Sequence, residues 1–270
     1  MTTAALGLLM SILLNRAYAV ILLSYVIIGI VYLFAPSILM AFVAATGVLL
    51  VWDLKRPERF LYIFLKPNPT SWLFWGSVAL AAFAAVASLW LLLGILDEAG
   101  SYDAEGAFDV LRWVAVPAAV MASGYTGFLF GQAEGRDLWQ SPVLFWHLQA
   151  QAVMVGAGAL AVAGLFLDLS DEAWTLIIAS FVIGTVAHLV ILLIEYAGKH
   201  ASRQAATAAH VITSGRYART FWMGSVVPTV LAAIVGVVAW VLGAVSTSAV
   251  LVSLAGLVVQ PALLAYESVF

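Results

Sequence analysis

The feature that most constrains this chain is a series of long apolar runs separated by short charged connections. An α-helix needs about 20 apolar residues to cross the roughly 30 Å hydrocarbon core of a bilayer. Hydrophobic residues make up 64% of the sequence and charged residues 9%, whereas a soluble domain has roughly 45 to 50% and about 25%. Because open sheet edges do not occur in lipid, the runs are predicted to be helices. We therefore expect an all-α integral membrane protein with a single transmembrane domain over residues 1–270.

Eight membrane spans are predicted. The runs lie at residues 4–34, 36–52, 72–95, 110–131, 143–167, 173–195, 219–243 and 246–268. The first two are open to other readings, because one long bent element with a short helix, or a stub with two short spans, fits equally well. Residues 1–14 lack the charged start and the cleavage site of a signal peptide, so we expect them in the mature chain.

The connections between eight spans alternate between two sides, face A and face B. Face A receives loops 53–71, 132–142 and 196–218, whose cations, with those of their flanks, are Lys55, Arg56, Arg59, Lys66, Arg136, Lys199, Arg203, Arg216 and Arg219. Face B receives loops 96–109 and 168–172, whose acidic residues are Asp97, Glu98, Asp103, Glu105, Asp109, Asp168, Asp171 and Glu172. Only Arg112 offsets this acidic charge. Since short cytoplasmic loops carry an excess of Lys and Arg, face A is predicted to be cytoplasmic.

A short sequence echo indicates an internal repeat. Residues 73–77 read Leu-Phe-Trp-Gly-Ser and residues 221–225 read Phe-Trp-Met-Gly-Ser, each opening a span after a cationic face-A loop. The spacing is compatible with two four-helix bundles. Preference of Trp for membrane interfaces and of Gly for helix contacts explains the echo equally well.

The polar side chains inside the spans gather near face A. Tyr125 and Gln132 are seven residues apart, as are His188 and Glu195, and His147 and Gln151 are four apart. These spacings place each pair on one side of a helix, with a rise of about 10 Å per seven residues. Asp53 ends the second span at the same face and Glu267 closes the eighth there. Buried polar groups are costly, so this one-sided distribution favours a function.

A polar half-membrane pocket suits an amphiphilic ligand whose head group needs hydrogen bonds while its tail stays in hydrocarbon. A quinone fits this description, and its oxidation requires a base with a water path. We expect Asp53 and His147 to act as catalytic bases, and His188 and Glu195 to form a proton path. The predicted quinone-binding residues are Asp53, Arg56, Tyr125, Gln132, His147 and Gln151.

Each of these residues also has a structural explanation. His188 could simply bond a neighbouring helix, Tyr125 could be an interfacial anchor, and Asp53 with Arg56 could be an ion pair of the loop. The glycines most simply provide close helix contacts, at Gly124, Gly127, Gly131, Gly156 and Gly158.

The composition excludes several kinds of site. The chain has no cysteine, so it offers no thiolate ligand for an iron-sulfur cluster or a zinc ion. No basic run suggests nucleic acid. Electrons from a quinone would therefore leave for a partner docked on face A.

Three stretches carry a family resemblance. Residues 53–60 read Asp-Leu-Lys-Arg-Pro-Glu-Arg-Phe, residues 67–72 read Pro-Asn-Pro-Thr-Ser-Trp, and Trp75-Gly76 follow. Tyr125-Thr126-Gly127 to Gly131 with residues 137–142, and Glu195 with residues 215–224, form two further stretches. Together they resemble the NrfD-like family, the polysulfide reductase membrane subunits.

The resemblance implies a haem-free membrane anchor that binds menaquinone or ubiquinone and belongs to a respiratory oxidoreductase complex. It implies an iron-sulfur subunit docked on the face of loops 53–71, 132–142 and 196–218, with a molybdenum or tungsten catalytic subunit beyond it. Asp53 and Tyr125 match positions associated with the quinone pocket. The expected location is the inner membrane of a prokaryote, where the chain is multi-pass and not catalytic alone.

Other functions stay open at the level of sequence. A cytochrome b type anchor would use His147 and His188 as haem ligands. A structural or proton-conducting membrane subunit would need no quinone chemistry. A retinal protein is poorly supported, because Lys55, Lys66 and Lys199 all lie outside the spans.

Overall fold

The computed structural model describes residues 48, 62–132, 137–166, 169–243 and 245–270. The elements in these parts of the chain are all helical, and no strand occurs among them. In order they are α3 (Tyr62–Leu65), α4 (Trp72–Glu98), α5 (Glu105–Gly131), the 3₁₀ helix η2 (Asp137–Gln140), α6 (Leu144–Gly164), α7 (Asp171–Ala197), α8 (Arg203–Thr213), the π-helix η3 (Thr220–Val226), α9 (Val227–Leu242) and α10 (Val245–Val269). The predicted all-α class is confirmed.

Six described helices are long and apolar enough to cross a membrane. They cover Trp72–Asp97, Glu105–Gly131, Leu144–Gly164, Asp171–Ala197, Thr220–Leu242 and Val245–Val269. The predictions for the third to eighth spans are thus confirmed to within a few residues. The predicted spans 4–34 and 36–52 lie outside the described residues, save residue 48. The chain is a multi-pass membrane protein.

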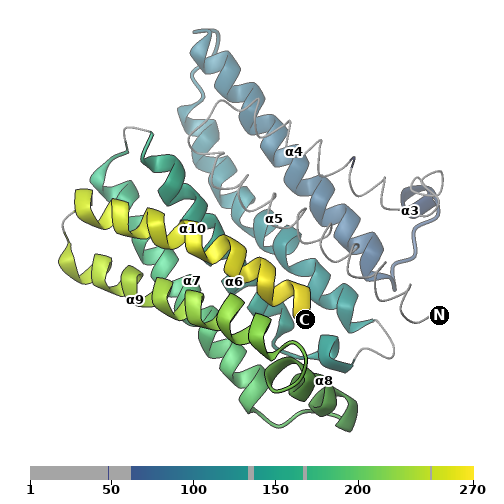
Figure 1. Cartoon of the computed structure of the whole chain (residues 1–270). Coiled ribbons are helices and arrows are strands. Elements are labelled where there is room, and N and C mark those ends of the chain that lie inside the picture. Colours follow the sequence, from purple (N-terminus) through teal and green to yellow (C-terminus); the bar gives the residue numbers. More distant parts are fainter. Residues whose placement is uncertain (1–47, 49–61, 133–136, 167–168, 244) are drawn as a thin grey trace.

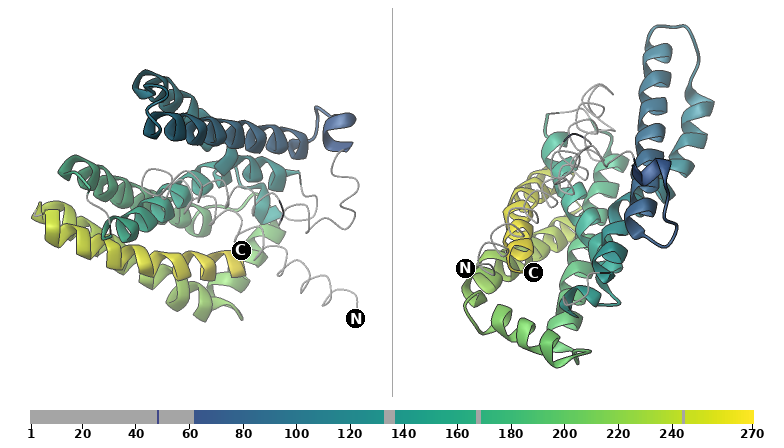
Figure 2. Two further views of the ribbon diagram at one scale, coloured as in Figure 1. Left: turned by 90° about the horizontal axis from the view of Figure 1, so that it is seen from above. Right: turned by 90° about the vertical axis from the view of Figure 1, so that its right-hand side faces the viewer.

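The spanning helices form three layers (Figures 1 and 2). The hairpin of α4 and α5 is the first layer, α6 and α7 form the middle one, and α9 and α10 form the third. The main cluster of buried apolar residues belongs to the last two layers and includes Met154, Phe181 and Val259. Neither α4 nor α5 contributes to that cluster. The molecule therefore consists of a helix hairpin beside a tightly packed four-helix bundle, α6, α7, α9 and α10.

Glycines let the bundle helices approach each other closely. A Cβ atom on Gly256 of α10 would lie 2.5 Å from the carbonyl oxygen of Gly158 on α6. A Cβ on Gly184 of α7 would lie 2.5 Å from the backbone nitrogen of Met154. Small residues permit such backbone contacts between membrane helices. The contact predictions for Gly124, Gly127 and Gly158 are confirmed. A Cβ on Gly131 would meet nothing within 4 Å among the described residues, and the predictions for Gly131 and Gly156 stay predictions.

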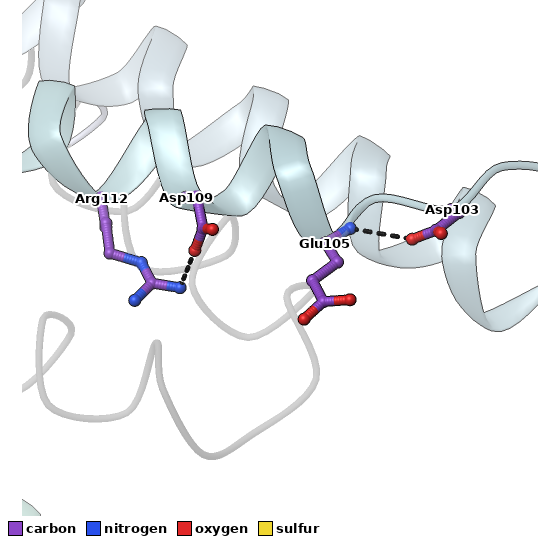
Figure 3. A network of polar contacts seen from close by, with 4 residues as sticks. All are labelled: Asp103, Glu105, Asp109 and Arg112. Atoms are coloured by element: carbon purple, nitrogen blue, oxygen red, sulfur yellow. Dashed lines mark hydrogen bonds and ion pairs between the residues drawn. The ribbon is translucent and has the colours of Figure 1, made fainter.

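The face-B end of α5 carries the predicted acidic side chains (Figure 3). On face B, the Asp103 side chain accepts a hydrogen bond from the backbone N–H of Glu105 at 3.2 Å, at the start of α5. One turn further, Asp109 pairs with Arg112. Acidic side chains near a helix N-terminus are stabilised by the helix dipole. On face A, α8 lies across the end of the bundle and buries Ala205, Ala209 and Ile212.

The echo between residues 73–77 and 221–225 has a structural counterpart. The indole of Trp75 donates a hydrogen bond to the carbonyl oxygen of Pro69 at 2.9 Å. The indole of Trp222 donates to the carbonyl oxygen of Thr213 at 2.8 Å. Each tryptophan side chain therefore connects the start of its span to the preceding face-A loop by a hydrogen bond.

Candidate functional site

A buried network of polar side chains lies at the face-A end of the four-helix bundle. Nδ1 of His147, in the first turn of α6, lies 2.8 Å from Oε2 of Glu195, in the last turn of α7. Nε2 of the same imidazole lies 2.9 Å from Nδ1 of His188, two turns earlier on α7. The side chains of His147 and Glu195 are 0% and 4% exposed. We call these three residues the relay, since they form a continuous carboxylate–imidazole–imidazole chain.

The protons of the relay can be assigned from its contacts. Nδ1 of His147 lies at ion-pair distance from Oε2 of Glu195 without an aligned hydrogen bond among the described residues. If His147 carries its proton on Nδ1, this proton lies beside the carboxylate and Nε2 becomes an acceptor. His188 must then carry its proton on Nδ1 to donate to His147. This leaves Nε2 of His188 as the basic end of the chain and Glu195 as the acidic end. In this assignment a proton passes from His188 through His147 to Glu195.

Further polar groups surround the relay. The hydroxyl of Tyr266 on α10 donates a hydrogen bond to Oε2 of Glu195 at 3.3 Å. The Gln151 side chain of α6 is buried beside the relay, and the Glu267 carboxyl group of α10 lies near it. Oε1 of Glu195 is buried and has no hydrogen-bond partner among the described residues. A buried oxygen of this kind is a place for a proton or an ordered water molecule.

A second polar group joins α5 to the start of α4. The Gln132 side chain accepts a hydrogen bond from the backbone N–H of Trp72 at 3.0 Å and donates one to the carbonyl oxygen of Thr70 at 3.2 Å. A Cβ atom added to Gly76 of α4 would lie 2.2 Å from Cδ2 of Tyr125, so the tyrosine ring packs directly against the backbone of α4. Gln132 and Tyr125 therefore share the side of α5 that faces α4, as their seven-residue spacing predicts. We call them the hairpin group.

The structure separates residues that the sequence grouped together. His147 and Gln151 are buried inside the bundle with His188 and Glu195, whereas Tyr125 and Gln132 lie in the hairpin. Gln149 occupies another side of α6, where it bonds Ser123 and the Val120 carbonyl group of α5. The predicted residues Asp53 and Arg56 lie outside the described residues. The described candidates thus form two groups at one face.

Sequence reasoning missed Tyr266 as a member of the network. This tyrosine is 1% exposed, and its ring centroid lies 5.3 Å from that of His147 and 5.7 Å from that of His188. A tyrosine near a predicted helix end is typical of the interfacial aromatic belt, so the sequence favoured that interpretation over a place in a buried network. The available signal was its position near the face-A end of its span, as for Glu195, because a buried carboxyl group needs a hydrogen-bond donor nearby.

The geometry of the two histidines bears on the haem interpretation. Metal–imidazole bonds are about 2 Å long, so an ion between two ring nitrogens holds them about 4 Å apart. His147 Nε2 and His188 Nδ1 are 2.9 Å apart and contact each other directly. This arrangement argues against a haem held between these histidines.

A comparison with protein families agrees with the resemblance. The family model described as polysulphide reductase, NrfD, matches residues 1–266. The chain belongs to the NrfD family. The match includes both the hairpin and the four-helix bundle, so the relay and the hairpin group are parts of one NrfD chain.

Two curated relatives match part of this NrfD chain. A Halobacterium salinarum protein, named as a putative membrane subunit of dimethyl sulfoxide reductase, is 30% identical over 144 residues, 47% of this chain and 33% of its own length. A tetrathionate reductase subunit from Salmonella typhimurium is 28% identical over 133 residues, 46% of this chain and 38% of its own length. The alignments thus span a little more than a third of each relative, at most.

Proposed function

We propose that this NrfD chain is a haem-free, quinone-reactive membrane subunit of a respiratory oxidoreductase complex, located in the inner membrane of a prokaryote. The observation that carries the proposal is the relay, a directed chain of three buried titratable side chains at one membrane face. Such chains of Glu and His inside membranes are typical of proton transfer. Quinone chemistry at face A requires proton transfer, because oxidation of one quinol releases two protons together with two electrons.

The relay can move protons one at a time. A proton that arrives at Nε2 of His188 allows the proton on its Nδ1 to pass to Nε2 of His147. The proton on Nδ1 of His147 then passes to Glu195, so that one proton enters and one reaches the carboxylate. Both contacts are within the 2.6 to 3.2 Å that suits proton transfer between heavy atoms. His147 is thus the central base, and His188 and Glu195 form the proton path.

The hairpin group supports the quinone head group in this proposal. Tyr125 and Gln132 lie at the face-A end of α5, and Gln132 holds the backbone at Thr70 and Trp72, the end of loop 53–71. Asp53 and Arg56 belong to that same loop in the sequence. We assign the head group of menaquinone or ubiquinone to Asp53, Arg56, Tyr125 and Gln132. On the bundle side, Gln151 donates a hydrogen bond and His147 accepts the proton that enters through His188.

Electrons need a partner subunit, because the chain has no cysteine for an iron-sulfur cluster. Face A offers a cationic surface for such a partner, with exposed side chains at Lys66, Lys199, Arg203, Arg216 and Arg219. None of these five forms an ion pair with another described residue. Complementary charge guides association and fixes orientation. We assign this surface to an iron-sulfur subunit, with a molybdenum or tungsten catalytic subunit beyond it.

Replacement of Asp53 by Asn tests the quinone assignment. The complex is purified through a tag on this chain, its subunits are identified by mass spectrometry, and quinol-linked electron transfer is measured. Because a general base contributes about 100-fold or more to rate, Asp53→Asn should lower turnover about 100-fold with the subunits retained. The matched control is Asp171→Asn, an exposed residue of face B. Unchanged turnover in an assembled Asp53→Asn complex would favour a structural or proton-conducting subunit without quinone chemistry.

A further inference from the structure

We infer that Tyr266 is a positioning residue of the relay, which holds Glu195 in the orientation that accepts a proton from His147. This inference rests on the proposed function, because it assigns the tyrosine a role in that proton transfer. The relay residues are on α6 and α7, whereas Tyr266 is on α10. The contacts around Glu195 therefore involve three helices.

The two carboxylate oxygens of Glu195 have different contacts. Oε2 meets both Nδ1 of His147, at 2.8 Å, and the hydroxyl of Tyr266, at 3.3 Å. Oε1 is buried without a partner among the described residues. With Oε2 held between these two contacts, the carboxylate has one orientation toward His147. The proton from His147 arrives at Oε2, and Oε1 is the oxygen to which it moves on or which binds a water molecule.

Tyr266 is itself held on several sides. Its ring stacks on that of Phe270, with centroids 5.5 Å apart and planes inclined by 18°. The carbonyl oxygen of Phe270 accepts a hydrogen bond from the indole of Trp139 in η2 at 3.2 Å. Trp139 is 5% exposed and lies in the face-A loop 132–142. A rigid series of aromatic residues thus connects that loop to Glu195.

Apolar packing alone does not account for the tyrosine. A phenylalanine would fill nearly the same volume beside the two imidazoles and Phe270. The hydroxyl adds a polar atom in a buried site, which is costly unless it forms a hydrogen bond. The hydroxyl contacts Oε2 of Glu195 at 3.3 Å and also the side chain of Tyr196. The contact with Oε2 is the one through which the hydroxyl acts on the carboxylate.

Redox-induced infrared difference spectroscopy of the purified complex tests the inference. Protonation of Glu195 on quinol oxidation gives a carboxyl C=O band, which is assigned by its loss in Glu195→Gln. In Tyr266→Phe the band should persist and move to higher frequency, because the hydrogen bond from the hydroxyl is missing. Turnover should fall about 5- to 20-fold, less than in a variant that lacks the carboxyl group. The control Tyr102→Phe makes the same change at an exposed face-B residue and should leave the band in place.

The outcomes distinguish the inference from the function on which it rests. A Glu195 band that is present but does not move in Tyr266→Phe would overturn the positioning role and leave the proposed relay intact. A wild-type complex without any Glu195 band would overturn the proton transfer itself and, with it, the role of Tyr266. If Tyr266→Phe fails to assemble, 3-fluorotyrosine at position 266 keeps the ring and provides a stronger donor. The band should then move to lower frequency, and a fixed band would again contradict the inference.

Discussion

The hairpin group and the relay lie at the same membrane face but differ in their partners. Gln132 bonds backbone groups of the loop that leads into α4, and Tyr125 packs against a glycine of that helix. The relay residues instead contact one another's side chains in a closed, buried network. A side chain that bonds backbone fixes the course of the chain, whereas a buried network of titratable groups can exchange protons. In the proposed function, the hairpin therefore positions a loop and the bundle provides the acid–base chemistry.

The largest effect is expected from Glu195→Gln. Glutamine keeps the shape of the side chain but takes up no proton from His147, so the relay ends at a neutral group. Quinol-linked turnover of the purified complex should fall about 100-fold, equivalent to about 2.7 kcal/mol in activation free energy. Glu172→Gln at the exposed start of α7 on face B is the matched control. A Glu195→Gln complex with normal turnover would remove the functional distinction between the two groups.

A smaller effect, on stability alone, is expected from Gly76→Ala in the hairpin. The added methyl group would stand 2.2 Å from Cδ2 of Tyr125, and overpacking of this kind costs about 1 to 3 kcal/mol. This exceeds the roughly 0.5 to 1 kcal/mol that alanine gains over glycine in a helix. The melting temperature of the complex should fall, while the infrared band of Glu195 stays unchanged.

Gly131→Ala is the control for this prediction, because a Cβ at Gly131 would meet no atom of the described residues within 4 Å. Equal melting temperatures for the two variants would show that the Tyr125 ring can move away from the added methyl group at little cost in free energy. The contact between Tyr125 and Gly76 would then contribute little to stability. A shifted Glu195 band in Gly76→Ala would show instead that the hairpin and the relay are coupled.

The smallest expected quantity is the coupling between the two groups, measured by a double-mutant cycle. Tyr125→Phe and His188→Gln share no partner among the described contacts. Their effects on activation free energy should add to within about 0.5 kcal/mol. Glu195→Gln and His188→Gln act in one chain, so their combined effect should be much smaller than the sum. A coupling above about 1 kcal/mol between Tyr125 and His188 would contradict the separation.

Helix periodicity predicted which side each polar residue faces, but not which helix it meets. The seven-residue spacing of His188 and Glu195 correctly placed both on one side of α7, and both contact His147. The four-residue spacing of His147 and Gln151 was equally informative, since both are buried. The sequence also located six of the spans, because hydropathy alone decides whether a segment enters lipid.

The neighbours of each helix depend on tertiary packing, which periodicity does not encode. Tyr125 and His147 lie at similar depth in consecutive spans, and this suggested one pocket. The structure instead turns Tyr125 toward Gly76 and His147 toward α7. The role of Tyr266 was hidden for the same reason, because its partner Glu195 is on a different helix, 71 positions away.

The most direct test of the central claim is quinol-dependent reduction of the iron-sulfur clusters in the purified complex, followed by electron paramagnetic resonance. If this chain is a quinone-reactive subunit, electrons should pass between quinone and the clusters, with cluster reduction about 100-fold slower in Glu195→Gln. If the wild-type complex is assembled and its clusters do not exchange electrons with quinone in either direction, the account is contradicted.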